Sequence, residues 1–244
     1  MLIIQKPLQP EWEGITPESY PKGMVLSLNK PYGWTSADVV RKIKFLLQRQ
    51  WNLKNLKVGH AGTLDPLATG ILLICIGKAT KAVESLQTQE KEYIASIRLG
   101  ATTPCFDLEK EIDQTYPYAH ITEESVQKAL ASMTGPQDQM PPQFSAKIID
   151  GARAYEWARS GVHAALKPSS IEIYEATMLQ YKLPDMVVRI RCSKGTYIRA
   201  FARDLGVALQ SGAHLTDLVR SQNGPFAIDQ SLAMEDFEKI FGQK

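Results

Sequence analysis

Short apolar segments that alternate with amphipathic segments predict an α/β (α+β) fold for this chain of 244 residues. Met24–Leu28 and Ile71–Ile76 are compact apolar runs typical of buried strands. Ala37–Arg49 instead carries apolar residues at the spacing of one helix face. Hydrophobic residues make up 44% of the chain, enough for a substantial core. The length fits one large domain, or a domain with a small appendage.

The N-terminal part divides into an arm, a strand, a turn and a helix. Residues 1–22 contain four prolines and no apolar periodicity, so we expect an extended or weakly ordered arm. After the strand at Met24–Leu28, Lys30–Ser36 reads as a turn. Ser36 is the expected N-cap of the helix at Ala37–Arg49.

The remaining elements are predicted from the same patterns. In chain order they are a central strand at Ile71–Ile76, a helix opening at Gly77–Lys81, an alternating strand at Glu90–Gly100, a helix at Thr122–Met133 with Thr122 as N-cap, strands at Ile171–Leu179 and Met186–Cys192, and helices at Ala200–Leu209 and Met234–Phe241.

Composition and spacing argue against several classes of protein. Three distant cysteines without a Cys/His ligand pattern indicate reduced thiols in a cytoplasmic protein and no metal site. No apolar run is long enough for a signal peptide or a membrane span. The Gly77-Lys78 pair lacks the upstream glycine of a phosphate-binding loop, so no nucleotide cofactor is expected. The net charge is only +2, so any nucleic-acid surface must come from clustered charges.

The densest signal is Gly59–Gly70, with three glycines and Pro66 in twelve residues. This composition predicts a shaped loop, and Pro66 restricts Asp65 to extended geometry. Between Val39 and Val83 there are eight lysines and arginines, and Asp65 is the only acid. A basic face suits the binding of a polyanion. Because a carboxylate on that face would repel phosphates, Asp65 has a role other than binding the polyanion. A structural Asp-Pro turn is the alternative.

Gly59–Gly70 resembles the core motif of the TruB family of tRNA pseudouridine synthases, in which the aspartate is catalytic. Cys192–Arg199 matches a second motif of that family completely, and Lys30–Ser36 resembles its first motif. The resemblance covers Gly23 to about Phe226. It implies the pseudouridine synthase catalytic fold, with a mixed, mostly antiparallel central sheet flanked by helices and loops.

The resemblance also implies the site residues. Asp65 would be the catalytic carboxylate, and Arg199 its charged partner. The residues implied to contact the substrate are His60 as a wedge in the RNA stack, Tyr93 stacked on the target base, Tyr197 near that base, Leu218 as an active-site leucine, and Arg199. From the residues alone, the alternative remains that His60 is a hydrogen-bonded structural histidine and that Tyr93 and Tyr197 are structural tyrosines of the core.

Two regions are less closely matched. In the motif after Gly100, Thr103 and Asp107 are kept, but Cys105 replaces a threonine and Lys110 a glycine, which leaves the geometry of this loop open.

By resemblance, an insertion at about 135–165 clasps the RNA, and we expect it to be mobile without RNA. Lys147, Arg153 and Arg159 fit phosphate contacts there. Residues 227–244 form a short tail, too few for the C-terminal PUA domain of many relatives.

The predicted function is isomerisation of a uridine in the T arm of tRNA to pseudouridine, after the nucleotide is flipped out of its stack. The reaction needs no cofactor. Asp65 could attack C6 of uracil, attack C1′ of ribose, or take a proton from C2′. The expected partner is the tRNA T stem-loop, bound by a monomer. The alternative is a catalytically silent RNA-binding or RNA-folding protein. A glycosidase would need a second acid near Asp65, which the basic surroundings disfavour.

Overall fold

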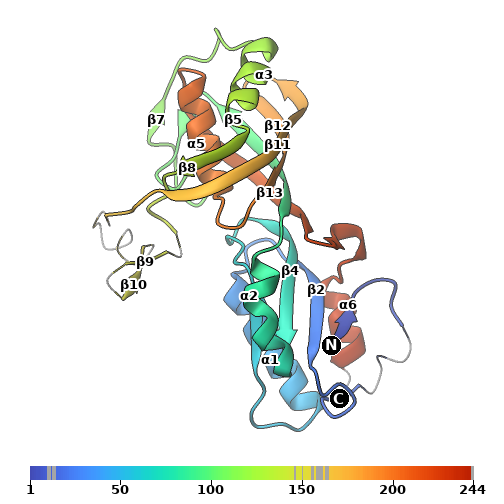
Figure 1. Cartoon of the computed structure of the whole chain (residues 1–244). Helices are drawn as coiled ribbons and strands as arrows, with labels where there is room; N and C mark the ends of the chain where they lie inside the picture. The colour runs from blue at the N-terminus through green and yellow to red at the C-terminus, as the bar shows by residue number, and fades with distance from the viewer. Residues whose placement is uncertain are drawn as a thin grey trace. The chain divides into compact units, whose positions relative to one another are not determined.

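The computed structural model describes residues 1–9, 12, 15–145, 147–149, 151–154, 157, 162 and 165–242. The chain forms two compact units, each with its own part of a sheet (Figure 1). The first unit is Met1–Lys91 together with Val219–Lys244, and the second is Glu92–Leu218. The boundaries predicted near residues 22 and 226 are the limits of the catalytic domain and not of these two units. They stay a prediction.

The first unit contains the two chain ends. Its elements are β1 (Leu2–Ile4), β2 (Met24–Lys30), α1 (Ser36–Gln50), β3 (Val58–Ala61), β4 (Thr69–Ile76), the 3-10 helix η2 (Gly77–Ala82), α2 (Val83–Gln87), the end of β13 (Ala213–Asn223), β14 (Phe226–Ala227), the 3-10 helix η3 (Ile228–Gln230) and α6 (Met234–Phe241). The predicted helix at Gly77–Lys81 is therefore a 3-10 helix that leads into α2.

β4 is the central strand of the first unit. It pairs antiparallel with β2 from Gly70 to Ile76 and with β3 over its second half. Val219 and Arg220 of β13 run parallel to its first residues, Thr69 and Gly70. Alternate side chains of β4 enter two different hydrophobic clusters, one on each face of the sheet. Burial on both faces explains why Ile71–Ile76 is a continuous apolar run rather than an alternating one.

The N-terminal segment is part of this core. β1 adds a parallel strand to β2, and Ile4, Trp12 and Ile15 are buried in the cluster that also holds Phe237 and Phe241 of α6. The Lys6 ammonium lies 3.1 Å from an Asp236 carboxylate oxygen, so β1 lies beside α6 (Figure 1). Of the two states predicted for residues 1–22, extended or weakly ordered, the extended one holds for β1, and the weakly ordered one is wrong for the described residues. The buried apolar residues of this segment pack in one cluster with α6, which follows more than 200 residues later.

Helix α1 begins one residue earlier than predicted, because Thr35 and not Ser36 is its N-cap. The Thr35 hydroxyl accepts a hydrogen bond from the Asp38 N–H, and the Asp38 carboxylate accepts one from the Thr35 N–H. This capping box leaves the Ser36 side chain available for a different contact. By contrast, Thr122 is the N-cap of α3 (Glu123–Ser132), as predicted, with Ser125 as its partner.

The second unit contains the longest strands. Its elements are β5 (Lys91–Leu99, of which Lys91 belongs to the first unit), β6 (Ala101–Thr102), β7 (Gln114–Thr115), α3, β8 (Gly135–Gln139), β9 (Ile148–Ile149), β10 (Ala152–Arg153), β11 (Ser169–Lys182), β12 (Asp185–Cys192), α5 (Ile198–Ala208) and the start of β13. The strands predicted at Glu90–Gly100, Ile171–Leu179 and Met186–Cys192 and the helices predicted at Thr122–Met133 and Ala200–Leu209 are present, with ends that differ by a few residues.

The strands of the second unit follow the order β13-β5-β12-β11-β8. β11 and β12 form a long antiparallel hairpin, and α3 contacts β11 and α5. Residues 135–139, predicted to belong to the mobile insertion, form β8 and pair antiparallel with β11. This part of the insertion is therefore an ordinary strand. Most of the strand pairs with a described register are antiparallel, as the family resemblance implies, whereas β1–β2 and β4–β13 are parallel.

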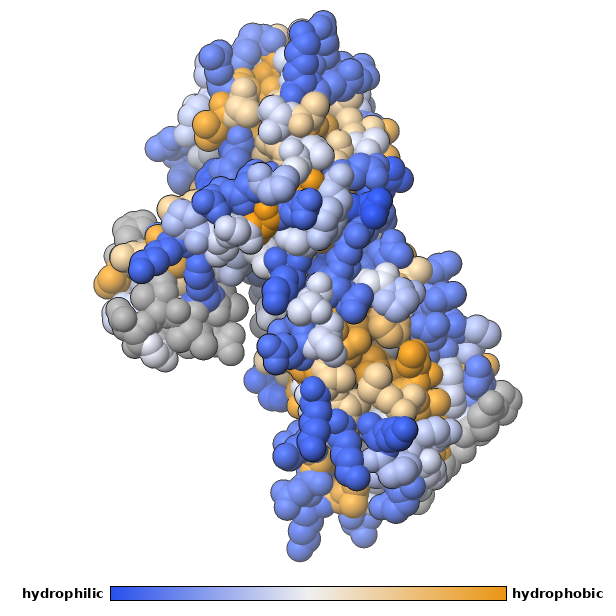
Figure 2. Space-filling model, in the orientation of Figure 1, coloured by the Kyte–Doolittle hydropathy of each residue, from blue (hydrophilic) through white to orange (hydrophobic). Residues whose placement is uncertain are grey.

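Among the described residues, no helix combines the length and the apolar character needed to cross a bilayer. On the face shown in Figure 2, hydrophobic residues form groups interrupted by hydrophilic ones.

Candidate active site

Asp65 lies on the connection between β3 and β4 in the first unit. Its side chain is partly exposed, whereas Leu64 before it is buried. The Asp65 carbonyl accepts a hydrogen bond from the Ala68 N–H at 3.1 Å, which closes a turn over Pro66. The structure thus confirms a shaped loop, and the carboxylate is not sealed in the hydrophobic core.

Ser36 fixes the residue immediately before Asp65. The Ser36 hydroxyl donates to the Leu64 carbonyl at 3.1 Å and accepts from the Leu64 N–H at 2.9 Å. Two bonds to one residue hold both backbone polar groups of Leu64, although Ser36 and Leu64 are far apart in the sequence. The sequence pattern indicated helix capping for Ser36, and the resemblance of Lys30–Ser36 to the family's first motif implied structural support for the Asp65 loop without identifying this contact.

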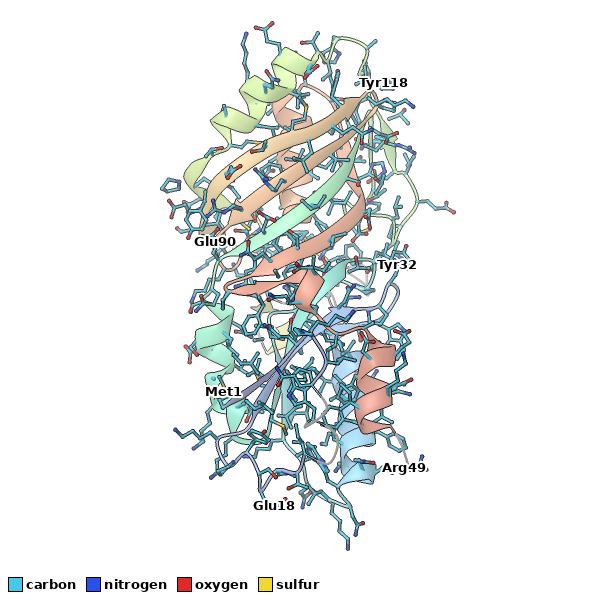
Figure 3. All side chains as sticks on the ribbon, turned by 90° about the vertical axis from the view of Figure 1, so that its right-hand side faces the viewer. Met1, Glu18, Tyr32, Arg49, Glu90 and Tyr118 are labelled. Atoms are coloured by element: carbon cyan, nitrogen blue, oxygen red, sulfur yellow. The ribbon has the colours of Figure 1, made fainter. Side chains whose placement is uncertain are left out.

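Lys30 fixes the residue immediately after Asp65. It is fully buried at the end of β2, and its ammonium donates to the carbonyls of Pro31 (2.8 Å), Trp34 (2.6 Å) and Pro66 (3.0 Å). The Gly33 N–H also donates to the Pro66 carbonyl, so the turn after β2 is tied to the Asp65 loop. Tyr32, labelled in Figure 3, lies on this turn and is 61% exposed.

The ammonium of Lys30 sits in a mixed electrostatic environment. Burial lowers its pKa from 10.5 to about 8, while the Asp65 carboxylate attracts the ammonium and counteracts part of this effect. The Arg220 guanidinium lowers the pKa further, and Asp38 raises it. Lys30 therefore changes charge close to the physiological range.

Activity is expected to fall as the pH rises through about 8, the pKa of Lys30. A neutral amine has only two N–H donors, so one of the three carbonyls that Lys30 holds would be left without its partner. Single-turnover rates on both sides of this pH would show the decline. In a Lys30→Arg variant, whose charge does not change there, the decline should disappear. The same decline in both proteins would contradict the prediction.

Stability should change in the opposite direction. Between about 8 and 10.5 an unfolded lysine binds the proton more tightly than buried Lys30, so the stability contributed by this group rises with pH. A fall in activity without a fall in thermal stability would therefore separate an effect on the loop from unfolding.

Arg220 holds the loop from the opposite side. It is 1% exposed and lies on β13 beside Gly70. Its Nε donates to the Ile71 carbonyl at 2.6 Å, and its terminal nitrogens donate to the carbonyls of Gly62 (3.1 Å) and Thr63 (3.5 Å). Like Ser36 and Lys30, it was not among the predicted site residues.

Arg199, one of the predicted site residues of the second unit, lies in the first turn of α5. Arg199 is 5% exposed, and its Nε lies 3.6 Å from an Asp107 carboxylate oxygen. Its terminal nitrogens donate to the carbonyls of Cys105 (3.3 Å) and Phe144 (2.9 Å). The pairing of Arg199 with Asp65, which the family resemblance implies, involves residues of two units and stays a prediction.

The loop after Gly100 is ordered around Asp107, despite its departures from the family motif. The Thr103 hydroxyl donates to the Asp107 carbonyl at 2.7 Å, and the Glu109 N–H donates to its carboxylate at 3.0 Å. The Cys105 thiol, whose pKa is raised by burial, lies 3.5 Å from the same carbonyl and donates to it. Cysteine in place of threonine therefore keeps a weak donor at this point.

Tyr93 and Tyr197 differ in exposure. Tyr93 is 8% exposed, on the face of β5 that also buries Ala95 and Ile97. Tyr197 is partly exposed, and its backbone exchanges two hydrogen bonds with the buried Gln139 side chain, at 2.8 and 3.1 Å. The backbone of Tyr197 is thus fixed where α5 begins.

The other predicted site residues lie on three further segments. His60 is on β3, opposite Ile74, and is partly exposed. Leu218 is buried on β13. The Lys147 ammonium donates to the Lys167 carbonyl and the Ser169 hydroxyl, at 2.8 and 2.9 Å. The Arg153 side chain and all of Arg159 lie outside the described residues.

The second unit has a pocket of about 410 Å³ beside Arg199. Phe106 and Phe144 line it, and Arg203 lies over the Phe106 ring at 5.5 Å. None of the predicted site residues lines this pocket. No group of three or more potential metal ligands occurs among the described residues.

The chain belongs to the TruB family, because the model of the TruB family pseudouridylate synthase N-terminal domain matches residues 49–198. Its similar relatives include tRNA pseudouridine synthase B of Bacteroides fragilis, 52% identical over 93% of this chain and 97% of the relative. The corresponding protein of Flavobacterium johnsoniae is 46% identical over 92% of this chain and 99% of the relative.

The fold is shared with a solved structure. A chain in the crystal structure of a Cbf5-Nop10-Gar1 complex superposes with a TM-score of 0.67 at 29% identity. The match covers 97% of this chain and 63% of that chain, so the present chain spans less than two thirds of its length.

Proposed function

We propose that this protein isomerises a uridine in the T arm of tRNA to pseudouridine, with Asp65 as the catalytic carboxylate. One observation carries the assignment of Asp65. It is a partly exposed carboxylate whose neighbours along the chain are held by three buried side chains: Ser36, Lys30 and Arg220. The relatives named tRNA pseudouridine synthase B support the substrate class.

The reaction breaks the bond between N1 of uracil and C1′ of ribose and forms a bond between C5 and C1′. The proton leaves C5, and N1 gains one, so the overall change is an isomerisation without oxidation or reduction. No external group is consumed. The protein has to flip the nucleotide out, hold the detached base and place a carboxylate against it, and such positioning supplies much of the acceleration.

The second unit supplies the proposed nucleotide-binding groups. In our proposal Tyr93 stacks on the base, while Tyr197 and Leu218 complete its surroundings. Stacking of a base on an aromatic side chain contributes on the order of 1–3 kcal/mol. Arg199 brings a positive charge that Asp107 and two backbone carbonyls orient. From the first unit, His60 takes the space that the flipped base leaves in the RNA. The protein acts as a monomer in the cytoplasm.

A tRNA transcript that carries tritium at C5 of its uracils tests the proposal. The label leaves C5 only when the new bond forms, so its release into water measures turnover, and mapping of the product gives the position. Release from the T arm supports the proposal. Tight binding of the transcript without release would instead favour an RNA-binding or RNA-folding protein and overturn it.

Replacing Lys147 with alanine is expected to weaken tRNA binding and to flatten its salt dependence. Removing one ammonium–phosphate interaction reduces the slope of log K against log salt by roughly one unit. Because the ammonium also holds Lys167 and Ser169, the loop itself would loosen. Binding of labelled transcript at several salt concentrations gives the slope.

A Ser169→Ala variant is the matched control for Lys147→Ala, since it removes one of these internal bonds and keeps the charge. Equal slopes for Lys147→Ala and Ser169→Ala would show that Lys147 does not bind phosphate.

A further inference from the structure

The backbone from Gly62 to Pro66 is held at every residue. Arg220 binds the carbonyls of Gly62 and Thr63, Ser36 binds both polar groups of Leu64, and Lys30 binds the carbonyl of Pro66. The Asp65 carbonyl is held within the loop, by the Ala68 N–H. All of these hydrogen bonds are made to backbone atoms of the loop, and none of them involves the Asp65 carboxylate.

Arg220 differs from Ser36 and Lys30 because it holds both ends of the loop at once. Its terminal nitrogens reach Gly62 and Thr63 before Asp65, and its Nε reaches Ile71, where β4 has begun. One planar guanidinium therefore fixes the distance between the two strands that carry the loop. Lysine, with a single donor group at its tip, cannot reproduce this fork.

The approach of Arg220 depends on Gly70. The two residues are paired in the register of β4 and β13, and a Cβ at position 70 would lie 2.3 Å from the Arg220 carbonyl oxygen. The backbone of Gly70 also has φ of +99°, which favours glycine. The loop motif thus ends on a residue that lets the β13 strand come close.

In the part of the chain that the structure describes, the guanidinium of Arg220 is bonded to the backbone of the loop and not to an acidic side chain. Of the described residues, none forms an ion pair with it, and only backbone carbonyls accept its donors. A buried charge is expensive to desolvate, and an apolar side chain here would leave the carbonyls of Gly62, Thr63 and Ile71 without this donor. What the charged fork adds is a fixed loop geometry.

We infer that Arg220 is a positioning residue for the reaction, which sets the geometry of the Asp65 loop through its carbonyls. The inference rests on the proposed function. It assigns Arg220 to the rate of the chemical step and not to RNA binding, because its buried guanidinium is occupied by the loop.

The test compares Arg220→Lys with the native protein in two measurements: the single-turnover rate of tritium release at saturating tRNA, and the dissociation constant of the same transcript. The expected result is a rate lower by roughly 10- to 100-fold, because two or three charge-assisted hydrogen bonds are removed, with a dissociation constant within about threefold of native. An unchanged rate would overturn the inference. Weaker tRNA binding by Arg220→Lys, together with a native rate at saturating tRNA, would also overturn the inference.

Two further variants keep the result interpretable. Arg98→Lys changes an exposed arginine paired with Asp185 in the second unit, and should keep the native rate. Ser36→Ala removes the two bonds to Leu64 without altering charge, and should also lower the rate at unchanged affinity. If Arg220→Lys does not fold, a native rate for Ser36→Ala overturns the premise that loop geometry limits the reaction.

Hydrogen exchange separates the role of Arg220 in the loop from its role in the reaction. In Arg220→Lys, the amides of residues 61–71 should exchange faster than in the native protein, and those of Arg98→Lys should not. If the native protein itself releases no tritium, the proposed function fails. Faster exchange would then still establish that Arg220 holds the loop, whereas unchanged exchange would refute that as well.

Discussion

An Asp65→Asn variant is expected to form no measurable pseudouridine while it still binds tRNA. The amide has the same size and keeps the backbone contacts of the loop, but it can neither act as a nucleophile nor accept a proton. Removal of a reacting carboxylate should lower the rate by roughly 10³-fold or more. Tritium release from C5 measures the rate, and retention of labelled tRNA on a filter measures binding.

Glu84→Gln is a suitable control for Asp65→Asn. Glu84 is an exposed acid on α2 in the same unit, so the substitution makes the same change of charge away from the Asp65 loop. Its rate should equal that of the native protein. A turnover near native for Asp65→Asn would exclude the carboxylate from the chemistry, whatever the affinity for RNA.

Replacing Asp107 with leucine is expected to destabilise the second unit strongly. Asp107 and Arg199 are both 5% exposed, and removing one partner of a buried ion pair typically costs about 3–5 kcal/mol. The substitution also deprives the Glu109 N–H of its acceptor. Urea denaturation should show the lower stability, and the remaining folded protein should turn over slowly, because Arg199 no longer has its orienting carboxylate.

Asp185→Asn provides the comparison for Asp107. Asp185 pairs with Arg98 at 2.8 Å, but both side chains are about half exposed, so solvent screens the interaction. Exposed pairs are worth about 0–1 kcal/mol. If the two variants were equally stable, the Asp107–Arg199 pair would not be a structural element of this unit.

The sequence predicted the elements whose signals are local. Compact apolar runs identified β2 and β4, and the apolar stripe of Val39, Ile43 and Leu47 identified α1. Thr122 was predicted correctly as a cap, and Ser125, which stands where glutamate would be ideal, completes its capping box. Thr35 was missed because two adjacent hydroxyl residues fit the same position, and only the Asp38 carboxylate decides between them.

The N-terminal segment could not be predicted from its own residues. Trp12 and Ile15 are isolated apolar residues among prolines, without the periodicity of a helix or strand. They are buried because α1 and α6 provide a surface for them, and α6 follows more than 200 residues later. Local patterns carry no information about such a distant partner.

The same reason explains which site residues were missed. Asp65 stands out because of its loop and its charge setting. Lys30, Ser36 and Arg220 act on backbone carbonyls and amides, which every residue has. The family's first motif implied that Lys30–Ser36 supports the loop, but no sequence pattern marks the individual partners. Arg199 was recognised through the family motif, but its contact with Asp107 required the structure, because 92 residues separate the two.

The chain order of the two units has a consequence for synthesis on the ribosome. Glu92–Leu218 is continuous, so it can fold as soon as it has emerged. The unit with Asp65 needs Val219–Lys244 as well, and both Arg220 and α6 are translated only after the whole second unit. The nascent chain therefore completes the support of its Asp65 loop late, and a product that stops before Arg220 would carry Asp65 on an unsupported segment.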